Sequence, residues 1–263
     1  MQLRKLQTTD VPGLIALKEA AGWNQTEDDL VRMLKLSPEG CFGIEAEGTL
    51  AASASVMCYG DDLAWIGMVL TLPQYRGQGF ARRLMDAVLE VAGNRAVRLD
   101  ASDMGKPLYE SMGFVSECVV ERWVRSPAPH TAVLEVQPVQ VNLALDREVF
   151  GADRSELLRD LPEGCSTEGS YAFFRPGSMA GYFGPCVSAS VSAGSRLLEH
   201  YVATRGTERP LALDLFPHLR ENVNTVLNLG FEPFRRLTRM VRKPARVTLP
   251  DRRIFAIAGF EWG

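Results

Sequence analysis

PQYRGQGFARR, residues 73–83, is the stretch from which the fold of this 263-residue chain can be argued. It follows an apolar run and opens a segment with helical periodicity, so it predicts a strand, a glycine-containing turn and a helix N-terminus. Backbone N–H groups converge at such a turn and bind phosphate. Gly77 and Gly79 let the backbone approach an anion closely, and Arg76 and Arg82 add positive charge. The stretch therefore predicts a site for a phosphate-bearing ligand.

Two common phosphate loops do not match this stretch. A Walker loop requires a Lys-Ser/Thr pair after the glycines, and none is present. A dinucleotide fingerprint requires a third glycine where this chain has Arg82.

A second motif lies about thirty residues further on. Leu99-Asp100-Ala101-Ser102 reads as the end of a buried strand, and Leu108-Tyr109-Glu110-Ser111-Met112-Gly113-Phe114 as a short helix and the start of another strand. With the pattern Arg76-x-x-Gly79-x-Ala81, this resembles the GNAT superfamily of N-acetyltransferases. The first motif resembles its pyrophosphate loop, and the second its fifth strand and following helix.

The resemblance implies a co-substrate and site residues. The co-substrate would be acetyl-CoA, and no metal is implied. Its binding residues would be Val69, Leu70, Thr71, Arg76, Gly77, Gln78, Gly79, Phe80, Ala81 and Arg82. Tyr109 would be the general acid that protonates the departing thiolate, a transfer that needs no large pKa shift from ordinary thiol and phenol values. Trp23 and Asn24 would frame the acceptor, or Trp23 would instead fill the edge of the core.

The general base is left open by the sequence. Many members of the superfamily carry a glutamate on the strand before the glycine loop, whereas residues 64–72 contain no carboxylate. Asp61 and Asp62 precede that strand, and Glu45 and Glu47 are more remote candidates. An amine that arrives partly deprotonated would need no dedicated base.

Composition limits the partners. A formal net charge of −3 argues against a protein that coats nucleic acid. No apolar run reaches the roughly 18 residues of a membrane span, and the N-terminus lacks an apolar core like that of a signal peptide. The five cysteines are scattered and the three histidines are widely spaced, so neither a disulfide framework nor a metal site is predicted. We expect a cytoplasmic protein without nucleic-acid or membrane partners.

The chain divides at Ser126-Pro127-Ala128-Pro129-His130, where two closely spaced prolines oppose regular structure. We predict an N-terminal domain over 1–126, a linker over 127–140 and a C-terminal domain over 141–263. In the first domain the predicted strands cover 2–7, 41–46, 49–58, 64–72, 97–101 and 114–125, with helices over 11–21, from Thr26, after Gly79 and before Gly113.

The second half repeats the first. Leu213-Asp214-Leu215, Gly230-Phe231 and Arg239 echo Leu99-Asp100-Ala101, Gly113-Phe114 and Arg122, and Tyr182-Phe183-Gly184 echoes Trp65-Ile66-Gly67. The second copy lacks the glycine loop but keeps the aspartate, as Asp214. An aspartate retained without the loop favours a structural role over a catalytic one, so Asp100 and Asp214 should share a role such as capping. Segments 146–154 and 174–177 resemble the C-terminal domain of a tandem group called YitH-like.

These observations predict an α/β (α+β) fold of two tandem GNAT-like domains, each with a mixed, mostly antiparallel central sheet flanked by helices. They predict an N-acetyltransferase (EC 2.3.1.-) acting on a primary amine of a small molecule or amino acid. The C-terminal domain would complete either the acceptor pocket or a homodimer. Two alternatives are a non-catalytic acyl-CoA-binding sensor or scaffold, and an unrelated nucleotide-binding domain.

Overall fold

The computed structural model describes residues 1–132 and 134–263. The strands are β1 (Gln2–Lys5), β2 (Cys41–Ala46), β3 (Thr49–Tyr59), β4 (Leu63–Thr71), β5 (Ala96–Ala101), β6 (Phe114–Arg125), β7 (Gln137–Pro138), β8 (Glu163–Thr167), β9 (Ser170–Arg175), β10 (Gly181–Val187), β11 (Leu211–Leu215), β12 (Glu232–Arg242) and β13 (Ile254–Ala256). The helices are α1 (Val11–Ala20), α2 (Glu27–Leu36), α3 (Phe80–Ala92), α4 (Lys106–Ser111), α5 (Leu143–Phe150), α6 (Ser155–Asp160), α7 (Val191–Arg205) and α8 (Arg220–Asn228), with 3-10 turns η1 (Thr8–Asp10) and η2 (Pro73–Tyr75).

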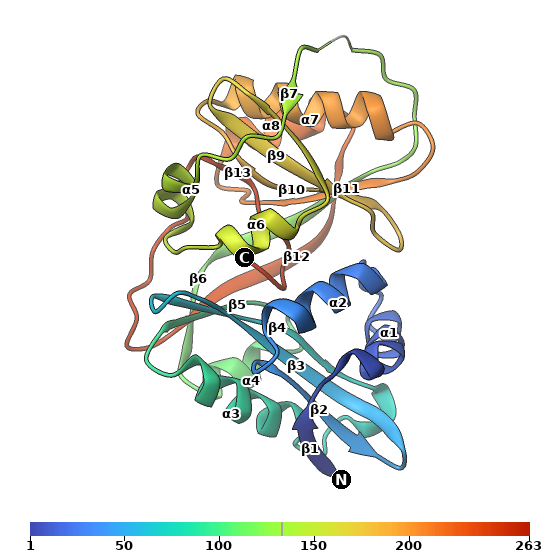
Figure 1. The fold of residues 1–263 in the computed structure, drawn as a ribbon, viewed down its shortest axis with the longest axis vertical. Helices are drawn as coiled ribbons and strands as arrows, with labels where there is room; N and C mark the ends of the chain where they lie inside the picture. The colour runs from blue at the N-terminus through green and yellow to red at the C-terminus, as the bar shows by residue number, and fades with distance from the viewer. Residues whose placement is uncertain (133) are drawn as a thin grey trace.

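The strands form one continuous sheet in the order β1-β2-β3-β4-β5-β12-β6-β11-β10-β9-β8-β7, with β13 beside β10. The β4–β5 and β10–β11 pairs are parallel, and the other described pairs are antiparallel. The two halves of the chain lie at opposite ends of the molecule, with β6 and β12 between them (Figure 1). The predicted mixed, mostly antiparallel architecture is confirmed.

The two halves exchange their last long strands. β6 belongs to the first half of the sequence but pairs with β11 of the second, from Leu211↔Arg125 to Leu215↔Glu121. β12 belongs to the second half but pairs with β5 of the first, from Thr238↔Ala101 to Val241↔Arg98. β6 and β12 also pair with each other along most of their length. Each half therefore completes its sheet with a strand from the other.

A buried ion pair fixes each exchanged strand. Arg122 on β6 donates two hydrogen bonds of 2.7 Å to the Asp214 carboxylate on β11. Arg239 on β12 donates two of 2.9 Å to the Asp100 carboxylate on β5. Neither carboxylate side chain has any exposed surface. Asp100 and Asp214 thus share a structural role, as the repeat predicts, but as ion-pair partners of the exchanged strands and not as caps.

The parallel strands separate at equivalent points in the two halves. β4 and β5 pair as far as Ile66↔Leu99, and β10 and β11 as far as Phe183↔Leu213. In the second half β13 lies in the opening, pairing with β10 at Cys186↔Ala256. In the first half no described strand pairs with β4 beyond Ile66 on that side. We name this opening, between residues 67–71 and the end of β5, the β4–β5 wedge.

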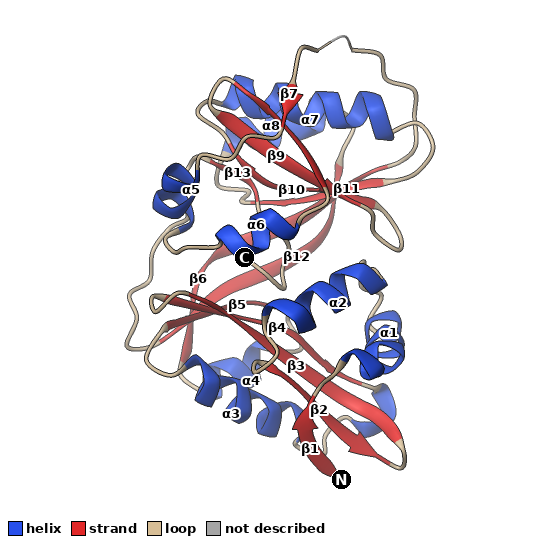
Figure 2. Cartoon of the chain, in the orientation of Figure 1, coloured by secondary structure: helices blue, strands red, loops and turns tan. Residues whose placement is uncertain are grey.

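Helices cover both faces of the N-terminal sheet (Figure 2). Phe80, Leu84 and Val88 of α3 pack on one face, against the even-numbered residues of β3. The other face carries α1 and α2, which pack on Met68 and Leu70 of β4. Among the described residues, no helix combines the length and the apolar character that crossing a bilayer requires.

The predicted domain limits, 1–126, 127–140 and 141–263, remain a prediction. The structure adds that hydrogen bonding crosses them, because β6 and β12 each serve the opposite half. It also places the short strand β7 within the predicted linker, paired with β8. The predicted strand over 64–72 is present as β4, with a bulge where Met68 has a φ of 50°.

Replacing Arg239 with Met should lower the free energy of unfolding by about 3–5 kcal/mol, because it leaves the Asp100 carboxylate buried and unpaired. Urea denaturation followed by circular dichroism measures this. Arg205→Met breaks an exposed pair with Glu163 and is the control, with a cost of at most about 1 kcal/mol. Equal costs for the two variants would contradict a stabilising role for the strand exchange.

Candidate active site

The glycine loop has the backbone geometry of an anion site. Gly77 and Gly79 have φ values of 76° and 77°, and Gly79 immediately precedes α3. A Cβ built on either glycine would meet nothing within 4 Å, so the loop lines open space. Only glycine adopts such φ values without strain. The N-terminus of α3, with its unpaired N–H groups and positive dipole end, faces the same place.

Cationic side chains surround this loop. Arg76 is exposed, and its Nε donates to the Thr71 carbonyl at 3.3 Å, which ties the loop to the end of β4. Arg82, on the first turn of α3, donates to the Ser111 hydroxyl on α4. Gln78 reaches back to the Gln74 carbonyl. The loop is therefore braced by β4 and α4 while its open side carries positive charge.

The predicted acetyl-CoA-binding residues at the end of β4, which are Val69, Leu70 and Thr71, run along the wedge. Val69 and Thr71 are half-buried, and Leu70 is buried against α1 and α2. Of the helix residues in the prediction, Phe80 is buried in the α3 core and Ala81 is half-buried. The structure thus brings the end of β4 and the loop together as one continuous stretch beside the wedge.

Tyr109 lies on α4, close to the end of β5. Its side chain is buried, with its ring edge-to-face on Phe114 at 6.0 Å and packed over Gly105. Burial raises the pKa of Tyr109, in contrast to the near-ordinary value that the sequence led us to expect. The phenol therefore keeps its proton throughout the physiological pH range.

The predicted acceptor residues have different environments. Trp23 is half-buried against the α1–α2 core. Asn24 is buried, accepts hydrogen bonds from the N–H groups of Met179 and Ala180, and donates to the Ala180 carbonyl. Its amide fastens the β9–β10 loop of the second half onto the first half. We therefore leave Asn24 out of the proposed acceptor site.

The four carboxylates that the sequence offered as bases do not line the wedge. Asp61 and Asp62 precede β4, at the end where β4 and β5 are still paired. Asp61 pairs with Arg95, and Glu45 pairs with Arg4 beside β1. Glu47 accepts a hydrogen bond from the hydroxyl of Tyr75.

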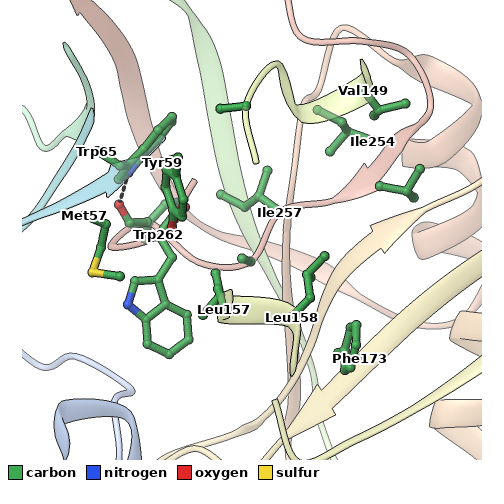
Figure 3. Close-up of a cluster of buried hydrophobic side chains, with 14 of the residues drawn as sticks. Met57, Tyr59, Trp65, Val149, Leu157, Leu158, Phe173, Ile254, Ile257 and Trp262 are labelled. Carbon is green, nitrogen blue, oxygen red and sulfur yellow. Dashed lines mark hydrogen bonds between the residues drawn. The ribbon is translucent and has the colours of Figure 1, made fainter. Parts of the chain in front are cut away.

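A segment that sequence reasoning did not single out, residues 257–263, lies across β4. A Cβ on Gly67 would stand 2.7 Å from the Glu261 Cα, so the two backbones are in direct contact. The Trp65 indole donates to the Phe260 carbonyl at 3.0 Å, and the Tyr59 hydroxyl to the Trp262 carbonyl at 2.8 Å. Figure 3 shows Tyr59, Trp65 and Trp262 gathered at this contact.

A cavity of about 290 Å³ lies between the halves, next to this segment. Its lining includes Leu63 and Trp65 of β4 and the side chains of Arg98, Arg154 and Arg239. Each of these arginines is already paired with a carboxylate. The cavity therefore lacks the uncommitted charge of the glycine loop.

The residues of the loop and the wedge fit a pyrophosphate-bearing thioester such as acetyl-CoA. The open glycines and exposed cations suit its phosphates, and the free edge of β4 suits its amide-containing arm. In the part of the chain that the structure describes, no group of three or more His, Cys, Asp or Glu is arranged to hold a metal.

Family comparison covers both halves. Residues 3–114 match the model of the acetyltransferase (GNAT) family, and residues 142–256 match that of an acetyltransferase (GNAT) domain. The N-acetyltransferase YitH of Bacillus subtilis, itself uncharacterized, is 27% identical over 251 residues, covering 88% of this chain and 87% of YitH.

Solved structures share the fold over the full chain. A protein of Pyrococcus horikoshii classed as an acetyltransferase has a TM-score of 0.87 at 18% identity, covering all of this chain and 95% of the other. A tandem GNAT protein from the clavulanic acid biosynthesis pathway has a TM-score of 0.60 at 13% identity, covering 95% and 99%.

Gly79→Asp should abolish acetyl-CoA binding, because it puts a negative side chain where phosphate would lie. Isothermal titration calorimetry measures the affinity. Gly169→Asp is the matched control, since Gly169 is also exposed, has a φ of 70° and has open space around its Cβ position. Both variants carry a similar backbone strain of about 1–2 kcal/mol. An equal loss in both would show that strain, not charge, is responsible.

Proposed function

The chain belongs to the GNAT acetyltransferase family, and from that premise we propose that its N-terminal half moves an acetyl group from acetyl-CoA to a primary amine of a small molecule or amino acid. Family membership supports acyl transfer from acyl-CoA as the general chemistry. One observation favours the N-terminal half as the site of transfer: its wedge, into which no described strand is inserted, lies beside two glycines of positive φ. The equivalent opening in the second half is filled by β13.

The chain's own groups would serve binding and proton transfer. When bound, acetyl-CoA supplies the acetyl group as a thioester that is open to attack by an amine. The N–H groups of residues 76–82 and the Arg76 and Arg82 guanidiniums would hold the pyrophosphate. The edge of β4 at residues 69–71 would align the thioester-bearing arm and offer N–H groups to the carbonyl oxygen as negative charge develops there.

Tyr109 would supply the proton that the leaving thiolate needs. Its raised pKa means that the phenol is protonated when the reaction begins. The transfer moves the negative charge from sulfur to the phenol Oη, which then regains a proton from solvent. We assign no comparable role to the tyrosines of the second half.

Release of free thiol from acetyl-CoA tests the function directly. Purified protein is assayed against amino acids, polyamines, aminoglycosides and peptides. Acceptor-dependent release that Gly79→Asp abolishes would establish the transferase and its acceptor class. Tight acetyl-CoA binding without release for any acceptor would favour the sensor or scaffold, and preference for ATP over CoA would favour an unrelated nucleotide-binding domain.

Tyr109→Phe should lower the rate of thiol release by about 10²-fold or more, because it removes the general acid. The affinity for acetyl-CoA should stay within about 2-fold of wild type, since the ring and its packing remain. Tyr201→Phe is the control, because Tyr201 is also buried but lies in the second half. Unchanged turnover in Tyr109→Phe would rule out the proton-transfer role.

A further inference from the structure

Buried polar atoms without hydrogen-bond partners gather at one place on β4. Among the described residues these orphaned atoms are Gln25 Oε1, Ser55 Oγ, Trp123 Nε1, Glu261 Oε2 and Trp262 Nε1. Ser55 on β3 is the cross-strand partner of Gly67, and Glu261 lies directly on Gly67. Trp262 is the next residue. Three of the five orphaned atoms therefore belong to residues around a single glycine of β4.

This glycine marks the inner end of the wedge. Gly67 is the first residue of β4 beyond its last pair with β5, Ile66↔Leu99. Ser55, Met57 and Tyr59 alternate toward the same face of β3, the face that residues 257–263 cover. The backbone and Cβ of Glu261 therefore lie where the two strands part, on the face opposite α3, and its carboxylate lies beside Gly259 and Arg175.

The Glu261 carboxylate is only half satisfied. Its side chain is 2% exposed, and its Oε1 lies 3.3 Å from Nη2 of Arg175 on β9, while Oε2 has no partner. Arg175 is shared with Asp29 of α2, whose Oδ1 lies 3.3 Å from its Nε. A buried carboxylate oxygen without a donor is costly, and the site favours any cation or N–H donor that reaches it.

The charged groups around Glu261 leave its carboxylate basic. Burial raises the pKa of Glu261, and Asp29 on α2 acts in the same direction. Arg175 on β9 and Arg122 on β6 act against this rise. Arg122 is itself engaged by Asp214, and Arg175 by Asp29. The carboxylate is therefore a better proton acceptor than an exposed glutamate.

We propose that Glu261, contributed by the C-terminal half, receives the ammonium group of the acceptor at the inner end of the wedge and takes its first proton. This inference rests on the proposed acetyl transfer. The acceptor is thus a small primary amine that arrives as a cation, and the Ser55 hydroxyl, which has no partner and belongs to the residue paired with Gly67, would accept a second N–H.

The proton balance follows from this placement. The ammonium gives one proton to Glu261 and becomes an amine, whose lone pair forms the C–N bond to the thioester carbonyl carbon. The C–S bond breaks and its electron pair leaves with sulfur. The second proton lost by nitrogen goes to solvent, and Tyr109 regains from solvent the proton that it gave to the thiolate. Glu261 also returns its proton to solvent, so each turnover releases one proton. No oxidant or further reactant is needed.

Amine binding can be read without turnover. With glutamate labelled by ¹³C at the side-chain carboxyl, the Glu261 resonance is assigned by its disappearance in Glu261→Gln or Glu261→Asp. Ethylamine, present as ethylammonium, should shift this resonance and move its titration midpoint to lower pH, whereas ethanol should not. A Glu261 resonance that ignores ethylammonium would overturn the proposal, and a response confined to Glu261 would support it.

Kinetics give a second, separate reading. Glu261→Gln should keep acetyl-CoA affinity within about 2-fold but lower turnover by about 10²-fold. In the wild-type protein, activity should rise with pH as Glu261 loses its proton, and this acidic limb of the pH–rate profile should be absent in Glu261→Gln. Glu261→Asp should recover part of the rate. Glu117→Gln is the control, because Glu117 is equally buried but paired with Arg98 on β5.

The two proposals fail differently. Full turnover with an unchanged pH profile in Glu261→Gln would overturn the role of Glu261 and leave acetyl transfer intact. An ethylammonium response at Glu261 in a wild-type protein that transfers acetyl to no amine would support the amine site and overturn the transferase.

Discussion

Two buried arginine–aspartate pairs hold the molecule together, because they bond each half's last long strand to the other half's sheet. Arg122–Asp214 and Arg239–Asp100 are related by the internal repeat, and in each the carboxylate has no exposed surface. Such a carboxylate is tolerated only while a guanidinium is paired with it, so removing either arginine would destabilise the exchanged strands. With β12 beside β5 and β6 beside β11, neither half has a complete sheet of its own.

The same architecture separates the roles of the two copies. In both copies two parallel strands separate after the same position of the repeat. The last pair is Ile66↔Leu99 in the first copy and Phe183↔Leu213 in the second. In the second copy β13 occupies the opening, and the chain then continues across the sheet to Gly67 in the first copy. The segment that closes one opening therefore delivers Glu261 to the other. On the proposal made above, the second copy contributes to the chemistry of the first copy through this segment.

Local features were predictable from sequence, and non-local ones were not. The glycine loop, the strand before it and the helix that carries Tyr109 depend on residues close together in the chain, whose periodicity and spacing are readable. The pairing of Asp100 with Arg239 joins residues 139 positions apart, and the repeat indicated that the aspartates were equivalent without showing that the strands are exchanged. The hydrogen-bond partners of Asn24 could not be read from sequence for the same reason, since they lie in the second half. Glu261 gave no local signal beyond being an acidic residue among apolar ones.

The strand exchange has a consequence for how the protein is made. During synthesis the ribosome delivers β1 to β5 long before β12, so the edge of β5 stays unpaired while well over a hundred further residues are translated. An unpaired strand edge of this kind is a site for misassociation, and distant pairings slow folding. The sheet of the first half is therefore completed only after β12 has been synthesised, near the end of translation.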